Sequence, residues 1–541
     1  MRKVAFILSL IVAIPMVAQD PMESFEQFRK QQEKSFGDFR EKTQEEYDLF
    51  RKRVNDEYAE FMRRAWAEFP AFDAEEPVEE KSIEPVYYEE PEQPQASQPQ
   101  PDQPVQPAQP TPDEETPAEP VPAEPEPIVH EDISQLTVPQ KGLEPAPVPI
   151  AVKPTVIIIP MPEPAPEPIA PVEVKEAPFK RVSIAYYGSL ITIGFPEDDH
   201  FKLNGSDENA IADGWKELAD SKYDITVKTA LDARKSSALC DWAYMDMLRR
   251  ACEKQYGKGN EATLAQAFLL VQSGYRIRIG NDNGKLQLLV ASQYDIYGLK
   301  YFVLDNTKFY VVSGDKNTRM HICESKYGKE KALSMQIAQL PKFSNDATPK
   351  RTLTSKKGVA ATVSVNKNLI DFFNNYPQAC YKGDYTTRWA AYANTPLDKS
   401  IKNALYPSLK KVIENMNERQ KVEILLNWVQ TAFEYQVDDK VWGHDRAFFA
   451  QETLYYPYCD CEDRAILFSR LVRDLVGLDV VLLYYPGHLA AAVGFTNEER
   501  GDYLTYKNRK YVVCDPTYIN AGVGRTMPGM NNQEAQVIAL K

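Results

Sequence analysis

The chain has 541 residues, enough for several domains, and a formal net charge of −15. That charge is concentrated in residues 73–178, which hold 23 Asp or Glu and four Lys, a net −19 that leaves +4 for the rest of the chain. The near-neutral remainder argues against a nucleic-acid-binding surface and against a strongly charged substrate.

Residues 1–18 have the pattern of a signal peptide. Met1-Arg2-Lys3 supply the charged start, an apolar run follows from Val4, and a small residue, Ala18, ends it. The run is too short to span a bilayer comfortably, and no cysteine near position 19 offers a lipid anchor. We expect an exported, soluble protein in the periplasm or outside the cell.

Residues 19–72 contain an 11-residue repeat of aromatic residues among charged ones. Two sets recur with this spacing: Phe25, Phe36, Tyr47, Tyr58 and Phe69, and Phe28, Phe39, Phe50, Phe61 and Phe72. Eleven residues make three helical turns, so we expect one long helix, ended by Pro70, with an aromatic stripe on one face. The stripe predicts self-association as a coiled coil, or docking on a partner or a membrane surface. The alternative is that the aromatics fold back on the body of the protein.

Residues 73–178 are predicted to be a disordered linker. They hold 27 of the chain's 40 prolines and one glycine, Gly142, with Glu, Gln and Ala filling most of the remainder. Such a segment cannot bury a core and favours extended polyproline II, so we expect a stiff tether. The apolar run Val156–Ile159 predicts one short strand within it.

Globular sequence begins near Phe179, and interspersed helical and strand periodicities predict an α+β class. We divide it into an α+β domain over residues 179–345 and a second domain over residues 346–541. The expected strands include the runs Val182–Phe195 and Gln287–Ala291. The expected helices are Asp241–Lys254, Glu261–Gln272, Ser400–Asn417, Glu418–Phe433 and Cys461–Leu475.

Three short motifs in the second domain supply a cysteine, a histidine and an aspartate. Cys461 opens an apolar-periodic helix, His488 begins a strand, and Asp515 ends one, and successive members are 27 positions apart. A nucleophile, a base and a group that orients the base are what thiol acyl transfer requires. Asp460 and Asp463 can form a capping box at the helix start. There the helix dipole and a nearby imidazole are expected to lower the pKa of the thiol.

These motifs resemble the core of the transglutaminase-like superfamily, over residues 415–520. The resemblance implies a papain-like fold in which a cysteine-bearing helix packs against an antiparallel sheet. It implies that Cys461 is the nucleophile, His488 the general base and acid, and Asp515 the orienter. The segments that carry it are Asp460-Cys-Glu-Asp-Arg-Ala, Gly487-His-Leu and Tyr511-Val-Val-Cys-Asp-Pro-Thr.

The reaction implied by the resemblance is acyl transfer through a cysteine thioester on a peptide or glutamine amide of a protein substrate, without a metal or cofactor. Backbone N–H groups at the helix start would hold the oxyanion, together with a donor from Tyr458 or Trp442. Water as the acceptor gives a peptidase or deamidase, and a lysine amine gives a cross-linking enzyme. Hydrolysis is favoured because it needs only an open site. Two departures from the family pattern, Cys459 for a glycine and Ala490-Ala491 for an aromatic, bear on substrate contacts.

Residues 179–345 contain a candidate degenerate copy of this core. Its triad positions hold Asn260, Lys285 and Gly314, which cannot act as nucleophile, base and orienter. The alternative is chance similarity between two helix–strand–strand units. The stretches from Asn260, Gly284 and Lys308 are similar to those from Cys461, Gly487 and Arg509.

The seven cysteines leave disulfide pairing open, except that Cys240 and Cys252, roughly 18 Å apart on one predicted helix, cannot pair. A non-enzymatic envelope scaffold with a vestigial triad is one alternative to an enzyme. The other is a zinc site, although its Cys-x-Cys spacing is less usual and it leaves Asp515 unexplained. The zinc ligands would be Cys459, Cys461, His488 and Cys514.

Overall fold

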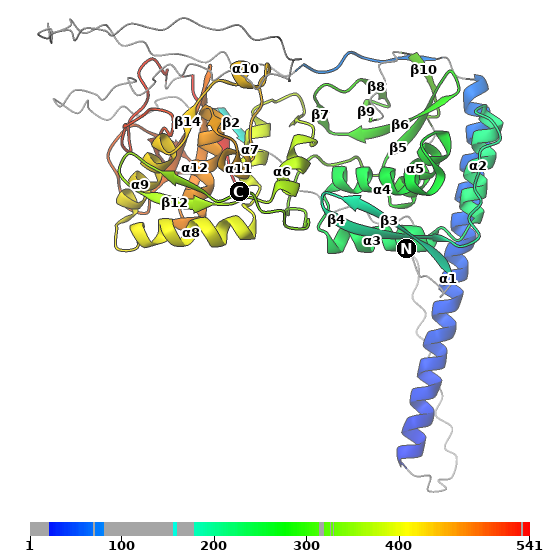
Figure 1. The fold of residues 1–541 in the computed structure, drawn as a ribbon. Helices are drawn as coiled ribbons and strands as arrows, with labels where there is room; N and C mark the ends of the chain where they lie inside the picture. The colour runs from blue at the N-terminus through cyan, green and yellow to red at the C-terminus, as the bar shows by residue number, and fades with distance from the viewer. Residues whose placement is uncertain are drawn as a thin grey trace, which may run out of the picture.

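The computed structural model describes residues 21–68, 71–79, 155–158, 178–312, 319–324, 326–327, 329–531 and 534–541. The predicted signal peptide, most of the predicted linker and Gly314 lie outside these ranges. Helices and strands are interspersed throughout the body, as an α+β class requires (Figure 1). Across these ranges we find no helix that combines the length and the apolar character needed to cross a membrane.

The helices and strands have the following bounds. The helices are α1 (Pro21–Glu68), α2 (Glu208–Asp220), α3 (Asp224–Ser236), α4 (Asp241–Tyr256), α5 (Asn260–Gln272), α6 (Lys367–Asn374), α7 (Thr387–Asn394), α8 (Lys399–Ile413), α9 (Glu418–Thr431), α10 (Asp438–Val441), α11 (Ala450–Tyr455) and α12 (Cys461–Leu475). The strands are β1 (Phe72–Asp73), β2 (Thr155–Ile158), β3 (Phe179–Tyr186), β4 (Ser189–Pro196), β5 (Ile277–Asp282), β6 (Lys285–Ser292), β7 (Tyr294–Ile296), β8 (Tyr301–Leu304), β9 (Thr307–Val311), β10 (Arg319–Ile322), β11 (Arg351–Thr354), β12 (Ala360–Val363), β13 (Ala379–Tyr381), β14 (Glu434–Tyr435), β15 (Tyr458–Cys459), β16 (Asp479–Tyr485), β17 (His488–Gly494), β18 (Tyr503–Tyr506), β19 (Arg509–Cys514) and β20 (Gln536–Ala539).

Most of the predicted elements are present, with one wrong helix end. The helices expected at Asp241, Glu261 and Cys461 correspond closely to α4, α5 and α12. The helix predicted to run to Asn417 stops at Ile413 instead. The physical reason is that Asn417 caps the next helix, α9, where its side chain and that of Gln420 form a capping box.

Two six-stranded sheets have the same topology. The first has the order β8-β9-β6-β5-β10-β1 and the second the order β18-β19-β17-β16-β20-β2 (Figure 1). In each module one helix, α5 or α12, precedes the strands and packs against the sheet. Only the outer edge differs, because β1 runs antiparallel to β10 whereas β2 runs parallel to β20. This shared order is what an internal duplication predicts.

The central hairpins align the two modules residue by residue. Asp282 pairs with Lys285 across an Asn-Gly turn, and Tyr485 pairs with His488 across a Pro-Gly turn. The glycines of the two turns have φ of 89° and 80°, a region that glycine adopts without strain. Lys285 therefore occupies in the first module the place of His488 in the second.

The register of the next strand, β9 in the first module and β19 in the second, changes the residue that is equivalent to Asp515. Val312 donates its backbone N–H to Leu288, and Cys514 pairs with Ala491 in the same place of the second sheet. The register thus assigns residue 313, rather than Gly314, as the counterpart of Asp515. Residue 313 also lies outside the ranges that the structure describes.

The segment predicted to be a disordered linker is ordered at two places. Phe72–Asp73 forms β1 on the edge of the first sheet, and Gly298 donates a hydrogen bond to the Val78 carbonyl at 3.4 Å. Thr155–Ile158 forms β2 on the edge of the second sheet, close to the strand expected from Val156. At Val156 this is the short strand that the sequence predicts, and at both places an edge strand offers unpaired backbone groups to an extended chain.

The helix predicted over residues 19–72 is α1, which begins at Pro21 and ends at Glu68. Phe72 lies in β1 and therefore does not continue the stripe. The C-terminal part of α1 packs beside α2, where Tyr58 and Met62 are buried (Figure 1). In this part, the alternative that the aromatics fold back on the body describes the packing.

Candidate functional site

Cys461 is the first residue of α12, at the end of the helix that faces the sheet's central hairpin. Asp460 caps this helix, and the backbone N–H of Asp460 donates to the Asp463 carboxylate at 3.3 Å. This bond is the half of the predicted capping box in which the Asp463 side chain reaches back to the residue before the helix. This box fixes the start of α12 and with it the backbone position of the sulfur.

His488 and Asp515 form a buried pair. Nε2 of His488 lies 2.8 Å from Oδ2 of Asp515. Asp515 Oδ1 accepts from the backbone N–H groups of Thr517, at 2.8 Å, and Tyr518, at 3.2 Å. Because the carboxylate can only accept, Nε2 carries the proton in this pair, and Nδ1 is left as the basic nitrogen.

The thiol of Cys461 lies beside the start of β17. It receives a backbone hydrogen bond from Leu489, the residue that follows His488. The first module has the same contact, since the Leu286 N–H donates to Oδ1 of Asn260 at 2.9 Å. The amide of Asn260 also donates to the Gly284 carbonyl at 2.7 Å, so it fills the place of the sulfur. The structure thus brings the start of α12 and the start of β17 together in the second module.

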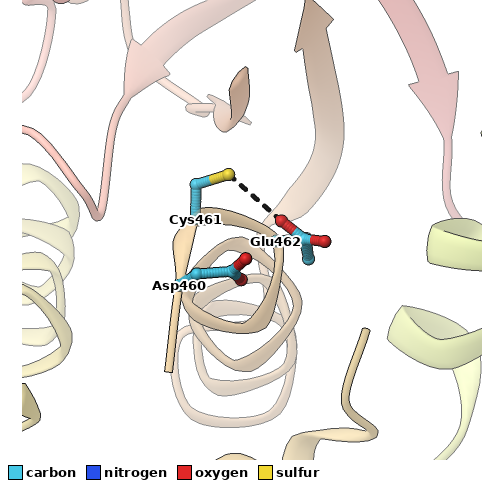
Figure 2. A group of neighbouring side chains, drawn as sticks. All are labelled: Asp460, Cys461 and Glu462. Carbon is cyan, nitrogen blue, oxygen red and sulfur yellow. Dashed lines mark hydrogen bonds between the residues drawn. The ribbon is translucent and has the colours of Figure 1, made fainter. Parts of the chain in front are cut away.

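The thiol of Cys461 points at a carboxylate rather than into an electropositive setting. It donates to Oε2 of Glu462 at 3.1 Å, and Figure 2 shows Asp460 on the same helix end. Burial, then the negative charges of Glu462 and Asp460, raise the pKa of Cys461 well above its usual range. The expectation of a lowered pKa is therefore wrong, because these carboxylates and desolvation outweigh the dipole of the helix.

Five buried carboxylates surround this helix start. Oxygens of Asp438, Asp445 and Glu462 lie within 4.8 Å of one another, and Asp438 forms a second such group with Asp460 and Asp463. Arg388 contributes a positive charge through its 2.8 Å ion pair with Asp445. Burial and the charge of Glu462 raise the pKa of Asp438 to about 8. Oxygens of this kind are suitable ligands for Ca²⁺ or Mg²⁺.

The cysteines beside Cys461 have other partners. The thiol of Cys459 donates to the Glu434 carbonyl and that of Cys514 to the Val512 carbonyl, both at 3.6 Å. The groups of clustered ligand atoms found in the described part of the chain do not include the set proposed for zinc. All seven cysteines are buried, and Cys240 and Cys252 do not pair, as expected.

The two candidate oxyanion donors, Trp442 and Tyr458, have different neighbours from Tyr435, an aromatic residue that the sequence did not single out. Trp442 packs against Phe448 and Tyr456, and Tyr458 lies in β15 next to Cys459. Tyr435 pairs across the sheet with Cys459. Burial raises the pKa of Tyr435 well above its usual range. No sequence signal marks Tyr435, because its strand is two residues long.

Gln430 of α9 was also missed, and it holds the loop that carries Asp515. Its Nε2 donates to the carbonyls of Asp515, Tyr518 and Ala521, at 3.0, 2.8 and 3.0 Å. The side chain is buried. A polar residue within the apolar-periodic run of a helix is the signal that could have identified it.

No protein-family model matches this chain, and no curated protein is similar to it.

Proposed function

We propose that the protein is an exported, periplasmic or extracellular, transglutaminase-like thiol acyl-transfer enzyme that acts on peptide or glutamine amides. The single observation that carries the proposal is the 2.8 Å contact between His488 and Asp515, placed where the next residue, Leu489, hydrogen-bonds to Cys461. In support, α12, which begins at Cys461, packs against β17, which begins at His488, and thiol acyl transfer uses a nucleophile, a base and an orienter of these kinds. Export rests on the sequence of residues 1–18.

In the proposed first step, Nδ1 of His488 takes the proton of Cys461 as the sulfur attacks the amide carbonyl. The carbon–sulfur bond forms and the carbonyl oxygen takes the electron pair. Backbone N–H groups at the start of α12 are suited to hold this oxygen, together with a donor from Tyr458 or Trp442. Because the thiol is protonated at rest, the proton transfer accompanies attack instead of preceding it.

In the second step the carbon–nitrogen bond breaks, and the imidazolium of His488 gives its proton to the leaving amine or ammonia. The product on the enzyme is a thioester of Cys461. Water, deprotonated by His488, then releases a carboxylate, or a lysine amine takes the acyl group and forms an isopeptide bond. We favour water as the acceptor, since hydrolysis requires no second binding site.

The experiment is to incubate the protein with a glutamine-containing peptide and a labelled primary amine. Label in the peptide means transamidation, and ammonia or cleavage without label means hydrolysis. Both products should vanish in Cys461→Ala and persist in Cys514→Ala, the same change at a second buried cysteine, whose thiol donates to the Val512 carbonyl. Activity that survives Cys461→Ala would overturn the proposal.

A non-enzymatic scaffold is the second candidate, and one observation favours it. The Cys461 thiol is held by Glu462, and carboxylates raise its pKa, which suits an inert cysteine. Under this reading, iodoacetamide should leave Cys461 unmodified in the folded protein at any pH at which the fold survives. Alkylation of Cys461 that is lost when His488 is substituted would favour the enzyme over the scaffold.

A further inference from the structure

The last aromatic pair within α1, Tyr58 and Phe61, packs against the body of the protein. Tyr58 lies with its ring centroid 4.8 Å from that of Trp215 and 5.3 Å from that of Tyr327. Phe61 is partly buried against the same core. The pair that recurs every 11 residues is therefore a packing surface where α1 meets the body.

The preceding repeats lie beyond the body. Arg51 forms an ion pair with Asp224 of the body. Phe50 is 43% exposed, and the part of α1 before it projects away from the rest of the molecule (Figure 1). Residues 21–50 of this helix span roughly 45 Å. Positions 25, 28, 36, 39 and 47 continue the face of Tyr58 and Phe61, because 11 residues return a helix to nearly the same direction.

The charges of residues 21–50 favour another helix over a membrane or a nucleic acid as the partner of this segment. Residues 21–50 carry eight acidic and five basic side chains, interspersed along the helix. A net negative helix is repelled by an anionic membrane and by nucleic acid. A helix with both signs beside an apolar stripe is complementary to another helix of the same kind.

An identical chain has a second advantage as a partner. Two copies carry the same 11-residue period, so every aromatic pair of one meets an aromatic pair of the other in register. An 11-residue period corresponds to about 3.67 residues per turn, which gives a slow right-handed supercoil instead of the left-handed one of a heptad. If each of six rings buries about half of its roughly 150 Å², the two copies together bury on the order of 1,000 Å², the lower limit for a specific interface.

We propose that residues 21–50 of α1 pair with the same residues of a second copy, so that the protein is a dimer joined through this helix. This inference does not depend on the proposed catalytic activity.

Sedimentation velocity of the full chain at micromolar concentrations tests the proposal. The wild type should have twice the mass of one chain, and the double variant Phe39→Asp/Phe50→Asp the mass of one. The matched control is Leu49→Asp, which makes the same change at a residue that is 70% exposed and lies about 100° around the helix from Phe50. It should remain dimeric. Copies with two different tags should co-purify as the wild type and fail to do so as the double variant.

Three outcomes would overturn the proposal. They are a wild type with the mass of one chain, a double variant that keeps the dimer mass, and a wild type that is monomeric in solution yet floats with phosphatidylcholine vesicles. The circular dichroism of each variant should match that of the wild type, which separates lost association from lost folding. The rate of Cys461 alkylation should be equal in all three proteins, so failure here and failure of the enzyme proposal are distinguishable.

Discussion

Nε2 of His488 and Oδ2 of Asp515 lie 2.8 Å apart, although 27 residues separate them in the chain. The contact fixes which ring nitrogen carries a proton. Since Nε2 is engaged, only Nδ1 can act as a base, and its orientation depends on the aspartate.

Asp515→Asn should lower the turnover number by a factor on the order of 10³ to 10⁴, because the amide cannot hold the same tautomer of His488. Turnover of a glutamine-containing peptide measures it, and KM should change little. Asp479→Asn, at the exposed start of β16, is the control and should keep full turnover. An Asp515→Asn enzyme as fast as the wild type would remove the aspartate from the mechanism.

Glu462→Gln should speed the alkylation of Cys461 by iodoacetamide at neutral pH roughly tenfold, because removing the carboxylate lowers the pKa of the thiol. The pH profile of alkylation should move to lower pH by the same change. Glu452→Gln removes another buried carboxylate, one that binds Arg446 at 2.9 Å, and should leave the profile in place. An identical profile in Glu462→Gln would show that Glu462 does not set the state of the sulfur.

Asp438 should make the fold less stable as the pH rises. Its pKa is raised to about 8 in the folded protein and is about 4 in an unfolded chain. The folded state therefore binds the proton more tightly. Its stabilising contribution is fully present below about pH 4 and is lost as the pH rises through about 8, an effect on the order of a few kcal/mol.

Thermal denaturation of Asp438→Asn from pH 4 to pH 9 tests this prediction. The variant should lose less stability than the wild type over this range, since the amide remains neutral. Asp439→Asn changes the exposed neighbour and should follow the wild-type curve. Parallel curves for the wild type and Asp438→Asn would contradict the prediction.

Asn55→Ala should destabilise the docking of α1 by about 2–4 kcal/mol, because three buried donors lose their acceptor. Oδ1 of Asn55 accepts from Trp215 Nε1 at 3.3 Å, Gln272 Nε2 at 3.1 Å and the Tyr327 hydroxyl at 2.6 Å. The free energy of unfolding in urea measures the loss. Arg53→Ala, on the exposed side of the same helix, should cost less than about 0.5 kcal/mol. Equal losses in the two variants would rule out this role for Asn55.

The sequence was sufficient to predict those parts of the site that depend on residues close together in the chain. The box of Asp460 and Asp463 follows from a spacing of three residues, and the periodic apolar positions after Cys461 locate α12. The equivalence of Lys285 in the first module and His488 in the second also follows from a sequence similarity, and the register of the two hairpins reproduces it.

The remaining features depend on contacts between distant segments, which no local pattern contains. Asp438 and Asp445 reach Glu462 from the region between α9 and α11, and Arg388 comes from α7. The pKa of Cys461 is raised first by burial, which depends on the packing of the whole domain, and then by the charges of its sequence neighbours Glu462 and Asp460. Pairing of β2 with β20 likewise joins residues several hundred positions apart.

The anchoring of β1 and β2 has a consequence for proteolysis. A protease that cuts the chain once between residues 80 and 154 produces two fragments, and each keeps a strand in one of the two sheets. The N-terminal fragment also retains the buried contacts of Asn55 and Tyr58. The nicked protein should therefore elute as one particle in native buffer, and its two pieces should separate only in denaturant.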